Sequence, residues 1–244
     1  MASQKVKYNL IYIILLFLVV ISIPLDYFFE NQSLELFIHG LFRISFSIYL
    51  LYFIKKENVF IIRNNKLSKK DLLLLPFAFT ISNNLLLIMF VDDIQVTLTA
   101  KILLTKIVFY FGVALIEEIV FRGCLVDYLN RLLNKSKLKA IIYSSLSFGL
   151  IHSINIFEIG LTPTIFQISY TFLTGLLFAF IYLYANNLTI CIILHFFYNL
   201  INETIFTGIV ETNWNIPMYL FTTLNILLTF FYALFLYRKR LIEK

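Results

Sequence analysis

The chain has 244 residues, of which 60% are apolar, 18% aromatic and 14% charged, and its formal net charge is +6. Soluble domains are about 45–50% apolar and about 25% charged, so this composition excludes an ordinary soluble domain and indicates a membrane protein. Cys124 and Cys191 both lie in apolar runs, which gives no sign of a disulfide framework. Because membrane spans in a chain of this length leave only short loops, we expect one integral membrane domain over residues 1–244.

A membrane-spanning helix needs about 20 predominantly apolar residues, and eight stretches of the chain meet this requirement. In chain order the predicted spans cover residues 8–28, 34–54, 72–91, 102–131, 138–156, 163–184, 188–209 and 216–237. The predicted fold is therefore all-α, a polytopic bundle of eight transmembrane helices.

Most of the 20 lysines and arginines fall on one side of this eight-span arrangement. They precede the first span, follow the last one and fill the connections after the second and fourth spans. The positive-inside rule then places both termini in the cytoplasm. Since topology explains the positive charge, nothing in it points to a nucleic-acid partner.

Within the fourth span, the apolar stretch 114–125 contains three charged residues, Glu117, Glu118 and Arg122. A single charge at the centre of a bilayer costs about 2.5–3.5 kcal/mol on insertion scales, so such residues point to a functional site. Glu118 and Arg122 are four residues apart, share a helix face and can pair. Glu117 is rotated by about 100° from Glu118 and points elsewhere. The alternative is a purely structural, ion-paired polar face.

Two later spans contain polar residues at helical spacing. The fifth span ends in a stretch with Phe148 and His152, and the seventh contains His195 and Asn199, which are four residues apart and share a face. Each of these polar side chains also fits a packing role, since His and Asn often form hydrogen bonds between helices of membrane bundles.

Depth in the bilayer indicates whether these residues can meet. At about 1.5 Å per residue from the cytoplasmic boundary, Glu117 and His152 lie roughly 21 Å deep, and His195 and Asn199 roughly 12 and 18 Å. These depths are compatible within the tilt of ordinary spans. We therefore expect one carboxylate, two imidazoles and one amide to form a site.

Such a set of groups suits hydrolysis of an amide bond within the membrane. A glutamate can act as general base towards water, a histidine can orient that water, and donors on another helix can hold the developing oxyanion. Zinc bound by Glu117, His152 and His195 is an alternative. The sequence has no H-E-x-x-H spacing, so these ligands would come from separate helices.

At these residues the sequence resembles the CPBP family, which comprises CAAX prenyl endopeptidases and bacteriocin-processing proteins and is also called Abi. The family's motifs, in order, are E-E-x-x-x-R, F-x-x-x-H and H-x-x-x-N. They correspond here to Glu117, Glu118 and Arg122, then Phe148 and His152, then His195 and Asn199. The flanking stretches 121–123, 174–176 and 187–188 are also similar. The resemblance covers roughly residues 102–205, which we treat as the catalytic core.

The resemblance implies an eight-helix, glutamate-dependent intramembrane protease without a cofactor. By analogy with the family, Glu117 and His152 activate the water, and His195 and Asn199 form the oxyanion site. Glu118 and Arg122 support this geometry. The implied substrate is a membrane-associated peptide or protein, with a role in peptide or bacteriocin maturation or in self-immunity. The composition, rich in Ile, Asn and Lys, suggests a bacterial plasma membrane.

Two functions of other classes compete with proteolysis. A membrane scaffold or bacteriocin-immunity protein would bind its partner without cutting it. A proton-coupled transporter would use intramembrane Glu and His as a proton relay.

Overall fold

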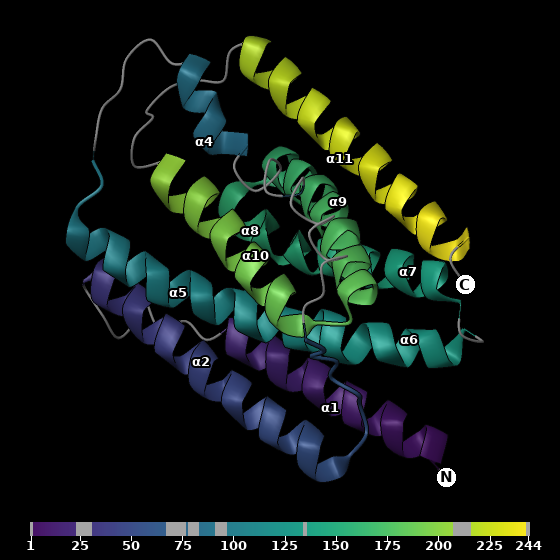
Figure 1. The fold of residues 1–244 in the computed structure, drawn as a ribbon. Helices are drawn as coiled ribbons and strands as arrows, with labels where there is room; N and C mark the ends of the chain where they lie inside the picture. The colour runs from purple at the N-terminus through teal and green to yellow at the C-terminus, as the bar shows by residue number, and fades with distance from the viewer. Residues whose placement is uncertain are drawn as a thin grey trace. The chain divides into compact units, whose positions relative to one another are not determined.

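The structure is a computed structural model that describes residues 2–22, 31–66, 77, 83–90, 97–133, 136–206 and 216–242. Helices make up most of the described chain, and Figure 1 follows them from the N-terminus to the C-terminus. The α-helices are α1 (Ala2–Ile21), α2 (Gln32–Glu57), α4 (Asn83–Leu87), α5 (Ala100–Glu118), α6 (Val126–Leu132), α7 (Lys137–Ile151), α8 (Ile156–Ile159), α9 (Leu161–Ala185), α10 (Leu188–Leu200) and α11 (Ile216–Ile242). Shorter helical segments of other types are η3 (Ile88–Phe90), η4 (Ile119–Leu125), η5 (His152–Asn155) and η6 (Ile201–Phe206).

The prediction of an all-α membrane protein agrees with these elements. Four described stretches are long and apolar enough to cross a membrane: Gln4–Ile21, Gln32–Glu57, Lys137–Glu158 and Gln167–Ala185. Of the predicted span 72–91, the described residues cover only Phe77 and the segment 83–90, so most of that span lies outside them. The count of eight spans and the cytoplasmic position of both termini stay predictions.

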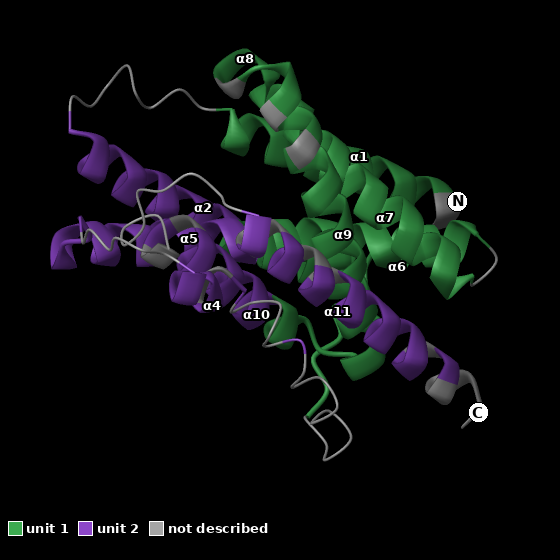
Figure 2. Ribbon diagram, turned by 90° about the horizontal axis from the view of Figure 1, so that it is seen from above, with its two compact units in different colours: residues 1–22, 47–66, 116–191 green, residues 23–46, 67–115, 192–244 purple. Residues whose placement is uncertain are grey.

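The chain divides into two compact units, which Figure 2 colours separately. Unit 1 contains residues 1–22, 47–66 and 116–191, and unit 2 contains residues 23–46, 67–115 and 192–244. Each unit is therefore assembled from three separate stretches of chain. The long helices α2, α5 and α10 each contribute residues to both units.

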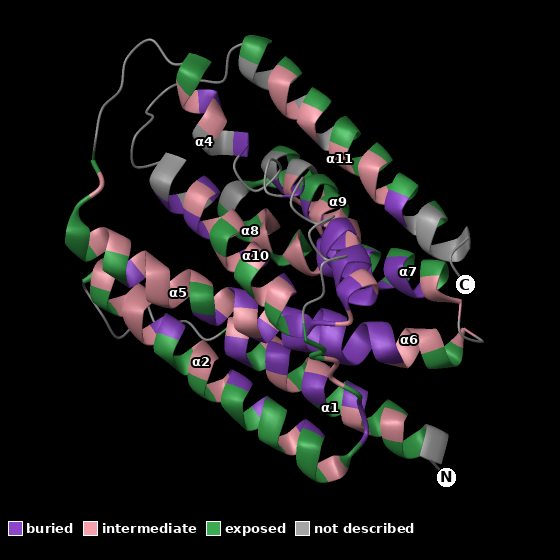
Figure 3. Cartoon of the chain, viewed as in Figure 1, coloured by how far each residue is buried: buried purple, intermediate pink, exposed green. Residues whose placement is uncertain are grey.

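Unit 1 is built around the packing of α7 against α9, with η4 and α6 beside α7. All seven residues of η4 are buried, and buried residues also fill the second half of α9 (Figure 3). An irregular connection after α2 joins this unit through an isolated antiparallel bridge between Asn64 and Asn187. The bridge is reinforced where Asn187 Nδ2 donates to the Asn65 carbonyl at 2.7 Å.

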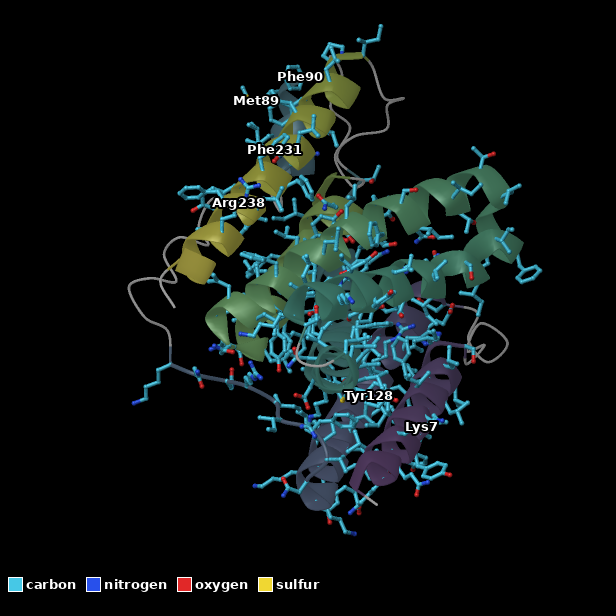
Figure 4. The ribbon with its side chains drawn as sticks, turned by 90° about the vertical axis from the view of Figure 1, so that its right-hand side faces the viewer. Lys7, Met89, Phe90, Tyr128, Phe231 and Arg238 are labelled. Carbon is cyan, nitrogen blue, oxygen red and sulfur yellow. The ribbon has the colours of Figure 1, made fainter. Side chains whose placement is uncertain are left out.

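In unit 2, α4 lies against α11. Asn83 Nδ2 donates to Thr222 Oγ1 at 3.0 Å, and Asn225 Nδ2 donates to Asn83 Oδ1 at 3.0 Å. The rings of Phe90 and Phe221 are 5.6 Å apart, and Figure 4 labels Phe90 beside Met89. Amides that bond one another satisfy their polar atoms where water is scarce, which explains how asparagines persist in these apolar helices.

The fourth predicted span is not a regular α-helix along its whole length. Its α-helical part ends at Glu118, a π-helical segment covers Ile119–Leu125, and α6 continues from Val126. In a π-helical turn a backbone N–H bonds to the carbonyl five residues earlier, and the N–H of Val126 accordingly donates to Phe121 O. Such turns occur frequently at functional sites. Here the turn begins directly after the two glutamates.

Candidate active site

The ion pair expected between Glu118 and Arg122 is formed. Arg122 Nη1 donates to Glu118 Oε1 at 2.8 Å. The side chains of Glu118 and Arg122 are 0% and 1% exposed. Two buried charges are expensive unless they are paired and further hydrogen-bonded, so the partners of this pair determine whether it is tolerated.

The guanidinium of Arg122 has additional partners on α7 and α9. Its Nη2 donates to the Gly175 carbonyl at 3.3 Å. Its Cζ lies 4.4 Å from the ring centroid of Phe148 and 5.5 Å from that of Phe178. A planar guanidinium can stack on aromatic faces and donate from its edge at the same time. Arg122 therefore connects the end of the double-glutamate motif to both helices that form the core of unit 1.

Phe148 connects Arg122 to His152. Its ring centroid is 5.4 Å from that of His152 and 5.1 Å from that of Phe121, both in edge-to-face arrangements. Phe148 belongs to the second motif, and these contacts show its physical role. One aromatic ring contacts the guanidinium, the imidazole and the π-helical segment, so the first two motifs form a single packed cluster.

The orientation of His152 follows from its hydrogen bond to the backbone. His152 Nδ1 lies 2.9 Å from the Phe148 carbonyl oxygen. A carbonyl oxygen can only accept, so Nδ1 carries the hydrogen of this contact. In the neutral imidazole, Nε2 then keeps its lone pair and can accept a hydrogen bond from water.

Glu117 and Glu118 lie in different surroundings although they are adjacent. Glu118 is fully buried in its ion pair, whereas Glu117, in the last turn of α5, is half-buried. This difference agrees with the helical phase that separates the two carboxylates. Glu117 belongs to the same unit as His152, on the helix that continues into η4.

His195 and Asn199 lie on α10, which is α-helical from Leu188 to Leu200, so their spacing places them on one helix face. His195 is buried and Asn199 is half-buried. Both belong to unit 2, whereas Glu117 and His152 belong to unit 1. Their convergence with the first two motifs therefore stays a prediction.

Sequence reasoning missed three polar contacts of the cluster. One is the Gly175 carbonyl, which accepts from Arg122. The second is Ser144, whose Oγ donates at 3.1 Å to the Phe121 carbonyl within the π-helical segment. The third is the bond from Asn155 Nδ2 to Gln167 Oε1, 2.8 Å long, which joins η5 to α9. Two features of the sequence could have indicated these contacts: Ser144 inside an apolar span, and the amide of Asn155 three residues after His152.

The described residues contain no group of three His, Cys, Asp or Glu side chains gathered as a metal site would require. The zinc alternative combines Glu117 and His152 of unit 1 with His195 of unit 2. That alternative thus depends on the same convergence as the metal-free site, and solution experiments distinguish the two.

Glycines permit the close contact of α7 and α9 beside the cluster. A Cβ atom on Gly149 would lie 2.9 Å from the Ile168 carbonyl oxygen, and one on Gly175 would lie 3.1 Å from Phe148 Cδ1. Of these two glycines, we expect Gly149→Ala to lower the free energy of unfolding more, by about 1–3 kcal/mol, because a backbone atom must move. Gly175→Ala should cost less, since the nearest atom belongs to the Phe148 side chain and the nearest backbone atom, Ser145 Cα, lies 3.3 Å away. Denaturant unfolding of the purified protein in detergent measures both.

The matched control is Gly123→Ala, in the π-helical segment. A Cβ atom there would meet no atom closer than 3.6 Å, an ordinary contact distance. This variant should unfold at the denaturant concentration of the parent. Equal losses of stability in all three variants would contradict the assignment of the α7–α9 contact to Gly149 and Gly175.

Comparison with known proteins gives one match. Residues 99–201 match the family model described as type II CAAX prenyl endopeptidase Rce1-like. No curated protein and no solved structure matches the chain. The matched region contains all three motifs, from Glu117 to Asn199. Over residues 99–201 the match thus confirms the resemblance of this chain to the CPBP family of CAAX-type endopeptidases.

Proposed function

We propose that the protein is an intramembrane endopeptidase that hydrolyses a peptide bond of a membrane-associated peptide or protein. The observation that carries this proposal is the packed cluster of Arg122, Phe148 and His152. Arg122 also pairs with Glu118, which follows Glu117 in the chain, and the cluster lies within the region that matches a CAAX endopeptidase family. The apolar helices support a membrane location, which we infer to be the bacterial plasma membrane.

In the proposed reaction, the carboxylate of Glu117 accepts a proton from a water molecule. The oxygen of that water forms a bond to the carbonyl carbon of the substrate, and Nε2 of His152 orients the water by accepting its second hydrogen. Donors on His195 and Asn199 stabilise the oxyanion that develops. The carbon–nitrogen bond then breaks, and Glu117 passes its proton to the departing amine.

The buried ion pair has a separate task in this proposal. Glu118 and Arg122 neutralise one another, and we assign proton transfer to the other carboxylate of the motif, Glu117. Because Arg122 also contacts Phe148, the pair fixes the position of the helix that contains Glu117 relative to α7, which ends next to His152. Glu118, Arg122 and Phe148 are thus positioning residues.

Cleavage assays on the parent protein test the proposal. Purified protein in lipid nanodiscs would be incubated with a quenched fluorescent peptide that ends in a farnesylated cysteine and three further residues. The same peptide without the farnesyl group and a bacterial membrane fraction are parallel probes. We expect mass spectrometry to detect cleavage at a defined bond in at least one of them. Comparison of the first two probes shows whether prenylation matters.

A binding protein is the main competing explanation. If none of the three probes is cut, and a Glu117→Ala, His152→Ala double variant still gives full protection against a bacteriocin in cells, the protein acts by binding. Flux of a solute in proteoliposomes that depends on Glu117 would instead identify a transporter.

The metal-free reaction makes its own prediction. Activity should survive prolonged dialysis against a strong chelator, because water activation is assigned to Glu117 and His152 without an ion. Loss of activity on dialysis, followed by recovery when zinc is added back, would identify the zinc alternative with Glu117, His152 and His195 as ligands. The measurement is the cleavage rate before dialysis, after it and after metal is returned.

A further inference from the structure

One end of the paired helices α1 and α2 in unit 1 is strongly basic. Lys5 and Lys7 lie in the first turns of α1, Lys55 and Lys56 lie in the last turn of α2, and all four are exposed. Lys5 Nζ is 3.1 Å from Glu57 Oε2, so the beginning of α1 and the end of α2 lie side by side. Four lysines and one glutamate leave a local positive charge. Figure 4 labels Lys7 of this lysine cluster.

On both helices, tyrosines lie next to the lysine cluster, on the side towards the middle of each helix. Tyr8 and Tyr52 are 67% and 60% exposed, and each is within about two turns of the lysines of its own helix. One turn deeper, the hydroxyl groups of Tyr12 and Tyr49 are 3.1 Å apart. Tyrosine is enriched where a membrane meets water, because its ring is apolar and its hydroxyl is polar. Exposed tyrosines beside a basic helix end are therefore typical of the headgroup level of a bilayer.

An exposed apolar stripe continues from the tyrosines along α1. Ile11, Leu15 and Val19 recur at spacings of four residues, which places them on one face of the helix, and all three are exposed. The surface thus combines a cationic end, a tyrosine level and an apolar stripe in that order. This order matches a molecule with an anionic headgroup and long acyl chains.

We propose that this surface binds an anionic phospholipid, with its phosphate among Lys7, Lys55 and Lys56 and an acyl chain along Ile11, Leu15 and Val19. Lysine ammonium groups and a tyrosine hydroxyl can both donate to phosphate oxygens. Clustered basic residues next to a membrane-spanning helix attract anionic lipids. A soluble acidic peptide or a nucleic acid would use the lysines but not the apolar stripe, so a lipid accounts for the whole surface.

The experiment measures the affinity of phosphatidylglycerol and phosphatidylcholine with identical acyl chains for the detergent-solubilised protein by native mass spectrometry. The parent should bind phosphatidylglycerol more tightly. A triple variant with Lys7→Gln, Lys55→Gln and Lys56→Gln should bind phosphatidylglycerol at least about fivefold more weakly, the effect expected of one lysine near an anionic surface. Phosphatidylcholine binding should change little, because the triple variant keeps the apolar stripe.

A second triple variant provides the matched control. Replacement of Lys101, Lys106 and Lys139 by glutamine removes the same total charge at other places, and phosphatidylglycerol affinity should stay within twofold of the parent. A third triple variant, with Lys7→Arg, Lys55→Arg and Lys56→Arg, keeps the charge and should keep the affinity for phosphatidylglycerol. Equal weakening in both glutamine variants would overturn the proposal. Displacement of the lipid by inorganic phosphate, at constant ionic strength, would also overturn it in favour of a simple phosphate site.

Discussion

We expect Glu117→Gln to lower the rate of peptide-bond hydrolysis by about a hundredfold to ten-thousandfold, the range that a general base contributes. Glutamine has nearly the same shape as glutamate but cannot accept the proton of the attacking water. Glu117 is half-buried, and the substitution keeps both partners of the ion pair, Glu118 and Arg122. The measurement is the single-turnover cleavage rate of the parent's best substrate in nanodiscs.

Two controls separate the loss of a base from the loss of the fold. The denaturant midpoint of Glu117→Gln should equal that of the parent. Glu117→Asp keeps a carboxylate but moves it by one methylene, so it should retain more activity than the glutamine variant. Parent-like cleavage by correctly folded Glu117→Gln protein would disprove the assignment of Glu117 as the base.

The features predicted correctly from the sequence are those that spacing within one helix determines. The Glu118–Arg122 pair is four residues apart, and a regular turn brings such residues together whatever surrounds them. His195 and Asn199 share a face of α10 for the same reason. The different burial of the adjacent Glu117 and Glu118 also follows from helical phase.

The missed features depend on contacts between segments far apart in the chain. The Gly175 carbonyl accepts a hydrogen bond from Arg122 because α9 packs against η4. Glycine has no side chain that would indicate such a contact in the sequence. The π-helical segment is equally hidden, since its hydrogen bonds are between backbone atoms. Ser144 donates a hydrogen bond to the Phe121 carbonyl of this segment from another helix, and the sequence does not reveal that partner.

Helix ends differ from the predicted spans where charged residues follow an apolar run. The second span was predicted to end at residue 54, whereas α2 continues to Glu57 through Lys55 and Lys56. Lysine is a good helix former, and positive charge is favourable at the C-terminal end of a helix. The helix therefore extends past the apolar run, and this extension places Lys55 and Lys56 beside the first turns of α1.

The ion pair itself leads to the largest expected change in stability. Replacement of Arg122 by methionine should lower the free energy of unfolding by about 3–5 kcal/mol, because Glu118 is left as an uncompensated charge in a fully buried position. Arg122→Lys should recover only part of this loss, since lysine lacks the planar guanidinium that lies over Phe148 and donates to Gly175. Denaturant unfolding in detergent measures each variant.

The double variant with Glu118→Leu and Arg122→Met distinguishes a purely stabilising role of the ion pair from a positioning role. Removal of both charges eliminates the unpaired carboxylate, so stability should return close to that of the parent. If the pair serves only stability, cleavage should return as well. If it positions Glu117 and His152, as proposed, the double variant should fold but stay slow in the single-turnover assay, because the contact between Arg122 and Phe148 is lost. A stable double variant with the parent's cleavage rate would therefore refute the positioning role while leaving Glu117 as the base.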